Sequence, residues 1–415
     1  MVFASGMAHT VTHDRARGSN LTGVRAYNER LILSLVRRRE NLSKADITRA
    51  TGLSAQTVSV IVRALEADGL LLRMSPQRGR VGQPSVPLQI DPTGAYSIGL
   101  KIGRRSANLV FMDFAGTVCR DIHWAYPFPT PAGLLAKLGS GLAEITKGLS
   151  EAELQRIAGI GVATPYELWN WTEALGAPQE VLDAWRNFDM QAEISALSPF
   201  PVIVSNDATA ACGAELTFGN GREHPDFVYF FVGSFIGGGV VLGRSLYPGR
   251  FGNAGAVGSM PIPCYRLHSA GVGSAGGSQQ LIALASLVRL EERLASNGHD
   301  PLSIFQSPSK WQPIGPVLDE WIDEAAYGLA HAIVASVSVI DFGAAIIDGA
   351  FPPDVRRQLV ARTRERIAEI DLQGLSPFQV LEGSIGANAR AIGGASLPLF
   401  AKYLLDRDVL FKEEV

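Results

Sequence analysis

The chain has 415 residues, of which 47 % are hydrophobic, 19 % are charged and 44 are glycine. This composition excludes a disordered chain and a single small domain, and it indicates two or three α/β domains with many glycine turns. The charge is uneven, because residues 1–91 hold 13 Lys and Arg against 7 Asp and Glu, whereas residues 92–415 hold 24 against 33. A basic head on an acidic body predicts that the head binds a polyanion.

The head begins with two predicted helices. Apolar residues recur at helical spacing over Asn28–Arg38, which ends in a basic run. A short second helix follows, with Ser43 as its N-cap and Asp46 at the capping-box position. Gly52 ends this helix and opens a tight turn.

The third predicted helix, Ala55–Asp68, is capped by Ser54 and carries polar side chains near its start. Its buried stripe is expected to consist of Val58, Ile61, Val62 and Leu65. Two short helices joined by a glycine turn fit the reading of a DNA major groove, with an ordinary helical hairpin as the alternative. The residues of these helices that we expect to contact DNA are Lys44, Ser54, Gln56, Thr57, Ser59 and Arg63.

A β-hairpin with a basic tip is predicted next. Gly69–Arg73 and Val86–Ile90 form its strands, and the tip Pro76–Pro84 contains arginine and glycine but no acid. Glycine allows close backbone approach to DNA, and arginine is attracted to phosphates and to the narrow minor groove. The head is therefore predicted to be a winged helix-turn-helix, with Arg78, Gly79 and Arg80 of the wing on DNA.

The body consists of apolar strands separated by glycine turns and helices. The predicted strands are Tyr96–Ile102, Ala107–Phe114, Val118–Trp124, Ile157–Ala163, Val202–Ser205, Val228–Val232 and Gly238–Leu242, and helices are expected over Ala132–Leu149 and Ala208–Leu216. Two successive α/β units that each start with antiparallel strands indicate an actin/hexokinase-like two-lobed fold with a cleft between the lobes.

Seven short segments, most of them containing glycine, extend from the wing to the end of the body. They are Arg78–Pro84, Tyr96–Gly103, Gly159–Pro165, Ser205–Ala211, Val232–Val240, Gly252–Met260 and Gly386–Ala395. In this order and spacing they make almost the whole chain similar to the ROK family (repressors, open reading frames and sugar kinases), in its winged-helix repressor branch. The resemblance implies a transcriptional regulator, a repressor in preference to an activator, that responds to a carbohydrate-like effector.

Three domains are expected on this basis: the DNA-binding head, 1–91; a first lobe, 92–213 with 398–415; and a second lobe, 214–397, which carries the dimer-forming region. One recognition helix covers only a few base pairs, so the partner of double-stranded DNA should be a homodimer or a dimer of dimers. The effector, the operator sequence and the choice between dimer and tetramer stay open.

The phosphate-binding loops of the family's kinases are altered here. Their Asp-x-Gly-x-Thr motif corresponds to a stretch in which Lys101 replaces the acid and Arg105 the threonine, and Phe235 stands in the second loop. A bulky ring prevents close backbone approach to a phosphate, so the chain is expected to have no catalytic residues, no cofactor and no enzymatic activity. Lys101 and Arg104 are expected to be surface charges in preference to a new anion site.

A zinc site is not expected either. The Glu-x-Gly-His of the family corresponds to Ala256–Ser259, and of its cysteine cluster Cys264 is left, with His268 nearby. Tetrahedral zinc needs four nitrogen or sulfur ligands. The other cysteines, Cys119 and Cys212, are too distant for a disulfide framework, which favours a reducing cytoplasm.

Asn206 and Asp207 survive at the end of a predicted buried strand. The resemblance implies that both bind the sugar, and a carboxylate accepts hydrogen bonds from adjacent hydroxyls well. The alternative is that Asp207 only caps the following helix. Tyr166, Trp169 and Trp171 follow a nearby loop and could offer an aromatic platform or simply pack.

Two other functions stay open. Asp207 would suit a bifunctional sugar kinase, which Lys101, Phe235 and Ala256 oppose. Ala256 stands where the family has the glutamate that binds sugar hydroxyls, and this loss would suit a body that responds to a protein partner.

Overall fold

The computed structural model describes residues 21–39, 41–76, 85–165, 168–170, 178–263, 277–305 and 308–405. The chain divides into two compact units, Met1–Asp207 with Ala391–Val415, and Ala208–Arg390. These boundaries lie a few residues from those predicted between the two lobes, and the head falls in the first unit. Its standing as a separate domain, residues 1–91, stays a proposal.

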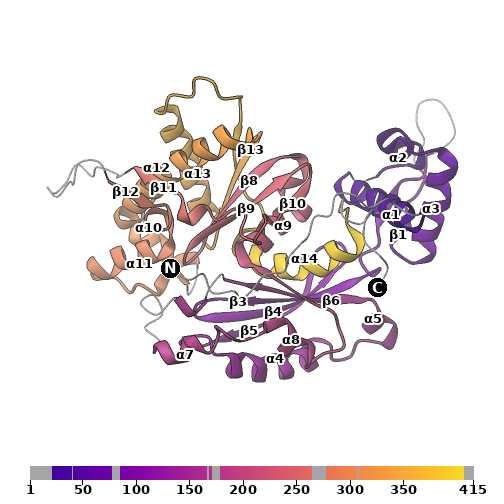
Figure 1. Cartoon of the computed structure of the whole chain (residues 1–415), viewed down its shortest axis with the longest axis horizontal. Coiled ribbons are helices and arrows are strands. Elements are labelled where there is room, and N and C mark those ends of the chain that lie inside the picture. Colours follow the sequence, from indigo (N-terminus) through magenta and orange to yellow (C-terminus); the bar gives the residue numbers. More distant parts are fainter. Residues whose placement is uncertain are drawn as a thin grey trace. The chain divides into compact units, whose positions relative to one another are not determined.

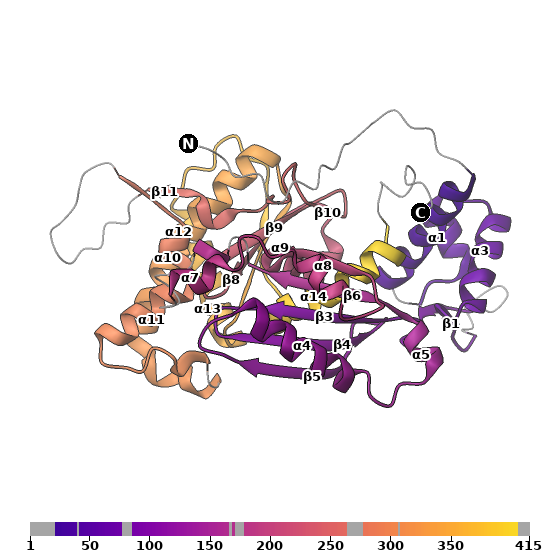
Figure 2. The ribbon, with the colours of Figure 1, turned by 60° about the horizontal axis from the view of Figure 1, so that its bottom comes forward.

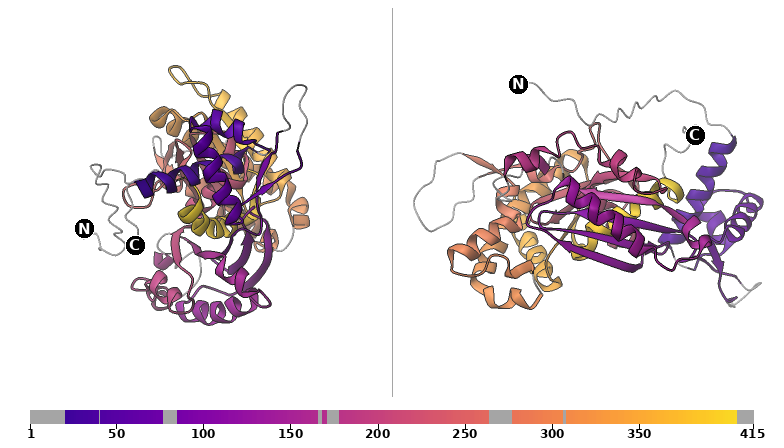
Figure 3. Two further views of the ribbon diagram at one scale, coloured as in Figure 1. Left: turned by 90° about the vertical axis from the view of Figure 1, so that its right-hand side faces the viewer. Right: turned by 90° about the horizontal axis from the view of Figure 1, so that it is seen from below.

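The described residues of the head form three helices and a two-stranded antiparallel sheet. They are α1 (Leu21–Arg38), α2 (Lys44–Thr51), α3 (Ala55–Ala67), β1 (Leu71–Arg73) and β2 (Leu88–Ile90). The indigo helices form one compact group in Figure 3. The first helix begins at Leu21 and not at Asn28, because Leu21, Val24 and Tyr27 extend the helical spacing of apolar residues towards the N-terminus in spite of Gly23.

Both predicted caps of the helix-turn-helix are present. The backbone N–H of Ser43 donates to Asp46 Oδ2 at 3.0 Å, and the N–H of Asp46 donates back to Ser43 Oγ at 3.3 Å. Gly52 ends α2 in the left-handed region with φ 71°, where glycine adds no Cβ clash. Ser54 caps α3, whose buried residues are the four predicted ones. The local sequence therefore fixes the turn between the two helices.

The sheet of the first unit has the strand order β5-β4-β3-β6-β7. Its antiparallel half consists of β3 (Tyr96–Ile102), β4 (Ser106–Asp113) and β5 (Val118–Ala125). The strands β6 (Ile157–Thr164) and β7 (Val202–Asn206) continue it in parallel to β3. Their carboxyl ends consequently meet at one edge, which is where ligands bind in open α/β sheets.

Helices cover both faces of this sheet, as Figures 1 and 2 show. On one face lie α4 (Pro131–Ile145), α7 (Gln179–Asp183) and α8 (Met190–Ser195), whose apolar side chains share a core with β3, β4 and β6; α5 (Glu151–Gln155) precedes β6. On the other face lies α14 (Ala389–Tyr403). A Cβ on Gly161 of β6 would clash with the carbonyl of Gly394, so glycine is what lets α14 approach this closely.

The second unit has a five-stranded sheet in the order β10-β9-β8-β13-β14. Its central strands are fully buried, and the long helix α12 places Trp321 and a series of small residues in the core. The strands are β8 (Phe227–Val232), β9 (Ile236–Leu242), β10 (Ser245–Tyr247), β13 (Ala344–Gly349) and β14 (Gln379–Glu382), with a separate pair β11 (Pro261–Pro263) and β12 (Ser278–Gln280). The helices are α9 (Asp207–Phe218), α10 (Ile282–Ala285), α11 (Leu287–Ser296), α12 (Gly315–Ile340) and α13 (Pro353–Ala368).

Two sheet-and-helix units of this kind, preceded by a winged helix-turn-helix head, agree with the predicted fold class. Among the described residues, no helix combines the length and the apolar character needed to cross a membrane.

Candidate nucleic-acid interface and ligand site

The outward face of α3 carries the predicted DNA-contacting residues to different degrees. Gln56 and Arg63 are exposed, whereas Thr57 and Ser59 are half-buried. The Arg63 guanidinium donates to Ser59 Oγ at 3.3 Å, which orients both side chains along the helix. Gln56 leads this face at the first turn of the helix, where side chains reach base edges most easily.

Ser54 and Thr57 form the cap of α3. The N–H of Thr57 donates to Ser54 Oγ at 3.1 Å, and the two hydroxyl oxygens lie 2.8 Å apart. This cap satisfies a backbone donor at the helix start. Both residues therefore have a structural role, in addition to any contact with DNA that the sequence predicts.

Lys44 lies at the start of α2 and is half-buried. Partial burial lowers the pKa of its ammonium group, and the nearby Glu66 carboxylate opposes that shift. Glu66 is itself paired with Arg73 of β1, at 2.5 Å from Nε and 2.7 Å from the second guanidinium nitrogen. If Lys44 contacts a DNA phosphate, its ammonium group does so with the Glu66 carboxylate nearby.

The predicted wing is described only at its base. The strands β1 and β2 pair from Leu71↔Ile90 to Arg73↔Leu88, and the N–H of Met74 donates to the Pro87 carbonyl at 2.8 Å. The described residues on either side of the tip are therefore paired antiparallel as far as Met74 and Pro87. Arg78, Gly79 and Arg80 lie outside the described residues, and their contact with DNA stays a prediction.

The predicted ligand residues stand at the carboxyl edge of the first sheet. Thr164 ends β6 and is in register with Asn206, which ends β7; Ala163 is in register with Lys101 of β3. Asp207 follows Asn206 directly and is the first residue of α9. The topology thus brings the ends of three parallel strands together and places Asn206 opposite Thr164, with Asp207 one residue further along the chain.

Thr164 is a residue that the sequence prediction did not select. Its hydroxyl oxygen is buried and has no hydrogen-bond partner within the described ranges. A buried hydroxyl without a partner costs free energy, so one is usually satisfied by a ligand or an ordered water. The available signal was its position between a buried strand and Pro165, the same kind of position that identified Asn206.

Arg104 is not the surface charge expected from the sequence, because only 6 % of its surface is exposed. Lys101 is half-buried, and its ammonium lies 3.5 Å from Ser106 Oγ of the neighbouring strand. The burial of both residues follows from strand geometry. They lie where β3 ends and the chain turns into β4, so their side chains lie against the sheet and not in solvent.

Of the three aromatic residues considered for a sugar platform, Trp169 is described and packs against the core of the first unit. The Arg186 guanidinium lies 6.0 Å from the centre of its ring. Tyr166 and Trp171 lie outside the described residues. Packing therefore accounts for Trp169 without a ligand.

In the second unit, the turn between β8 and β9 is closed by α11. The N–H groups of Leu287 and Val288 donate to the carbonyls of Gly233 and Ser234, at 3.0 and 3.2 Å. The N–H of Ile236 donates to Ser286 Oγ at 3.0 Å. The amides at the start of α11 and of β9 are thus used within the protein itself.

Ala256–Ser259, which replace the family's sugar- and zinc-binding motif, lie at a short 3-10 turn. Cys264 and His268 lie outside the described residues. Across the ranges that the structure describes, no three His, Cys, Asp or Glu side chains come together as metal ligands.

Two buried carboxylates in the second unit were not predicted. Glu215 of α9 accepts hydrogen bonds from the N–H and hydroxyl of Ser384, and burial raises the pKa of its carboxyl group. Asp348 of β13 accepts from the N–H of Gly386 at 2.8 Å and from Arg356 at 3.1 Å. Both hold the loop that precedes α14, and neither has a sequence signal beyond an acid inside an apolar run.

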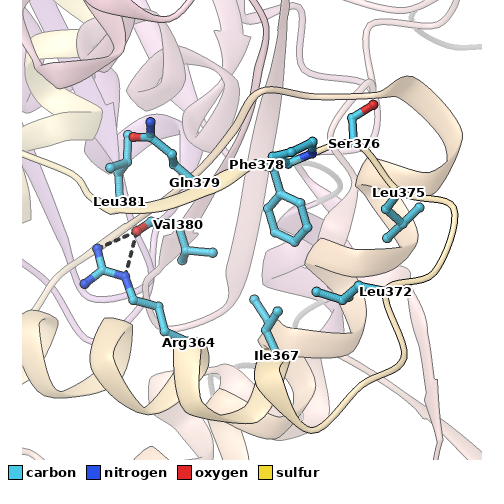
Figure 4. Close-up of a pocket in the computed structure, with 10 residues that line it drawn as sticks. Arg364, Ile367, Leu372, Leu375, Ser376, Phe378, Gln379, Val380 and Leu381 are labelled. Atoms are coloured by element: carbon cyan, nitrogen blue, oxygen red, sulfur yellow. Dashed lines mark hydrogen bonds between the residues drawn. The ribbon is translucent and has the colours of Figure 1, made fainter.

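A pocket of about 500 Å³ lies between α13 and β14 in the second unit. Its lining is largely apolar, with Phe378 and Ile367 facing each other across it (Figure 4). Arg364 donates two hydrogen bonds to the Val380 carbonyl, at 2.9 and 2.5 Å, so its guanidinium is already engaged. A polyol would find few polar groups here, and no residue of the predicted site lines this pocket.

Comparison with known proteins finds two family models that match different parts of the chain. A family model described as ROK family matches residues 97–399, and one described as MarR family matches residues 21–80. The xylose repressor of Bacillus subtilis (strain 168) is 25 % identical over 252 residues, which cover 58 % of this chain and 62 % of the repressor. The match thus spans less than two thirds of that relative.

Two solved structures have a similar fold. A ROK family transcriptional regulator, described as a homologue of the E. coli MLC protein, superposes with a TM-score of 0.64 at 20 % identity, over 94 % of this chain and 100 % of the other. A ROK family glucokinase from Streptomyces griseus, in complex with glucose and AMPPNP, has a TM-score of 0.55 at 23 % identity, over 73 % and 99 % of the two chains.

Proposed function

The chain belongs to the ROK family, and we propose that it is a cytoplasmic transcriptional repressor that releases or binds its operator in response to a carbohydrate-like effector. The observation that carries the proposal is the capped pair α2–α3, whose second helix presents Gln56 and Arg63 to solvent. The match to a xylose repressor supports the same function. Selection of duplexes from a random-sequence library by the purified chain tests it, and enrichment of a palindromic site is the expected result.

The DNA-binding form is proposed to be a homodimer or a dimer of dimers. A two-fold pair of α3 helices reads two half-sites about one helical turn, ~34 Å, or a multiple of it apart. Analytical ultracentrifugation with and without the selected duplex gives the number of chains for each bound duplex.

Replacing both wing arginines, Arg78→Ala with Arg80→Ala, is expected to weaken binding to every duplex. If each arginine displaces one counterion, the slope of log affinity against log salt falls by roughly two. Titrations of operator and random duplexes at several salt concentrations measure this slope. Gln56→Ala is the matched comparison: it should reduce discrimination between operator and random DNA and leave the slope nearly unchanged. An unaltered slope in the double variant would remove the wing from the interface.

The effector site is proposed at the carboxyl edge of β6 and β7. Asp207 and Asn206 supply acceptors and a donor for adjacent hydroxyls, and Thr164 supplies a hydroxyl without a partner in the described ranges. A panel of pentoses, hexoses and amino sugars is expected to contain a compound that raises the melting temperature of the chain. At a concentration of 100 times its Kd such a ligand adds about 2.7 kcal/mol of stability. A panel without any shift would favour a protein partner as the signal.

The body is proposed to have lost sugar kinase activity. The turn between β8 and β9 contains Phe235, and its Gly233 and Ser234 carbonyls accept hydrogen bonds from α11. Lys101 stands in place of the acid of the family's kinases, so we expect the positioned metal and phosphate contacts of phosphoryl transfer to be lost.

We accordingly expect no ATP-dependent phosphorylation of any sugar in the panel, and Lys101→Asp should not restore it because Phe235 remains. A coupled ADP-release assay, with a ROK glucokinase as positive control, measures this. Sugar-dependent ADP release that disappears in Asp207→Ala would establish a bifunctional kinase. Metal analysis of the purified chain accompanies the assay, and stoichiometric zinc would contradict the proposed absence of a metal site.

Coupling between the effector site and the head is proposed to pass through α9 and α14. The chain crosses between its two units at Asp207/Ala208 and at Arg390/Ala391, within the first turns of these two helices. Beyond the far end of α14, the N–H of Leu405 donates to Ser34 Oγ of α1 at 2.9 Å. A ligand on Asp207 therefore acts at a crossing point, and α14 runs from the other crossing to the head.

A second contact joins the head to the rest of the first unit. The Arg37 guanidinium donates to the Phe114 carbonyl at 2.6 Å and lies 4.7 Å from the centre of the Phe114 ring. Phe114 in turn packs edge-on against Tyr403 of α14, with ring centres 5.0 Å apart. Helix α1 is thus held by residues that also contact α14, which supports transmission of movement along this path.

A further inference from the structure

Val60 is an exposed valine in the middle of the outward face of α3. Its surface is 53 % exposed, whereas each residue of the buried stripe of this helix is at most 4 % exposed. Val60 follows Gln56 by four residues and precedes Arg63 by three, and helical residues at these spacings lie on the same side. The three side chains therefore form one continuous strip, polar at both ends and apolar at its centre.

Helix stability does not explain a valine at this position. A β-branched side chain loses rotamer freedom in a helix, and an exposed one gains little from burial in the fold. Single exposed apolar residues are common, so exposure alone would carry no argument. What distinguishes Val60 is its place between two side chains on the helix that the proposed function puts into the major groove.

The hydrogen bonds of the neighbouring side chains reduce the number of candidates for contacting DNA bases. Ser54 and Thr57 hold the cap of α3, and Arg63 is hydrogen-bonded to Ser59 one turn beyond Val60. The side chain of Gln56 has no hydrogen bond within the described part of the chain. Gln56 and Val60 are consequently the side chains of this strip that are open to a partner of matching chemistry.

The major groove presents one apolar group, the C5 methyl of thymine, among hydrogen-bond donors and acceptors. Glutamine pairs with the N6 and N7 edge of adenine. We propose that Val60 contacts the C5 methyl of a thymine in each operator half-site, and that Gln56 forms hydrogen bonds with an adenine close to it. This inference rests on the proposed function. Four residues advance the helix by about 6 Å and base pairs are about 3.4 Å apart, so the two contacts fall within roughly two base-pair steps.

Deoxyuridine tests this contact, because it differs from thymidine in the missing methyl group and keeps the same hydrogen-bonding edge. A duplex selected by the wild-type chain is prepared in variants, each with one symmetric pair of thymines replaced by deoxyuridine. For one such pair of thymines, the affinity of the wild-type chain for the duplex should fall by roughly fourfold for each half-site. This factor corresponds to the loss of one buried methyl-sized group. Val60→Ala should bind the unmodified duplex with the same loss and show no further loss on the deoxyuridine duplex.

Val24→Ala is the matched control, since Val24 is an exposed valine of the head on α1 and outside the strip. It should retain the full deoxyuridine penalty. Val60→Ala raises helix propensity at an exposed position, so the variant should fold, and its melting temperature verifies this. A full deoxyuridine penalty in Val60→Ala, or none in the wild type, would overturn the contact while leaving DNA binding intact. Failure of the wild type to select any duplex would instead overturn the proposed function, and the contact with it.

Discussion

Asp207→Ala is expected to abolish the response of operator binding to the effector and to leave operator binding of the ligand-free chain near its wild-type affinity. Asp207 follows directly on Asn206, the residue of β7 in register with Thr164, at the point where the chain passes into its second unit. Coupling free energies between two sites are typically ~1–3 kcal/mol, which corresponds to a change in operator affinity of roughly 5- to 150-fold. The variant should lose this whole factor.

Fluorescence anisotropy of a labelled operator, titrated with protein at zero and saturating effector, measures the factor directly. Linkage requires that saturating operator change the effector affinity by the same factor, which calorimetry checks independently. Asp121→Ala is the matched control, because Asp121 is an exposed carboxylate on β5, the opposite edge strand of the same sheet. A full effector response in Asp207→Ala would move the sensing site away from this edge.

Gly161→Ala is expected to destabilise the first unit by about 3 kcal/mol or more, at the upper end of the cost of overpacking a core. The added methyl group would clash with the backbone carbonyl of Gly394, and backbone in the middle of α14 cannot move aside as a flexible side chain can. For a unit of this size the melting temperature should fall by roughly 6 to 12 °C. Differential scanning fluorimetry followed by calorimetry measures the shift.

Gly139→Ala provides the comparison, because Gly139 lies within α4 and its added Cβ would have no neighbour within 4 Å. Replacing an exposed helical glycine by alanine gains about 0.5–1 kcal/mol. The same chemical change should therefore have opposite signs at the two positions. Equal melting temperatures for Gly161→Ala and the wild type would mean that α14 does not lie against β6 as closely as the structure shows.

Much of the fold could be predicted because its signals are local. The cap at Ser43, the turn at Gly52 and the stripe beginning at Val58 each depend on residues within one or two turns of the chain. The bounds of β3 were predicted at Tyr96 and Ile102, since an apolar run between glycine turns marks a buried strand. The first helix was predicted too short, although Leu21, Val24 and Tyr27 continue its apolar spacing past Gly23.

The parts that could not be predicted depend on contacts between distant segments. Arg104 is buried by the way β3 turns into β4, and nothing in its neighbours along the chain indicates this. The unpartnered hydroxyl of Thr164 becomes visible only when hydrogen bonds are traced in three dimensions. Glu215 and Ser384 are far apart in sequence, so their hydrogen bond also needed the structure.

The discontinuity of the first unit has a consequence for protein synthesis. Its sheet is made early, but α14, which covers one face of that sheet, is translated only after the entire second unit. The described helices and strands of the head lie within residues 21–90 and are translated before both, and domains generally fold in the order in which they emerge from the ribosome. A nascent chain therefore contains the helices of the head well before α14 can cover the sheet that ends at Asn206. Between these two moments, the growing polypeptide carries the helices proposed to bind DNA and a body sheet with one face still uncovered.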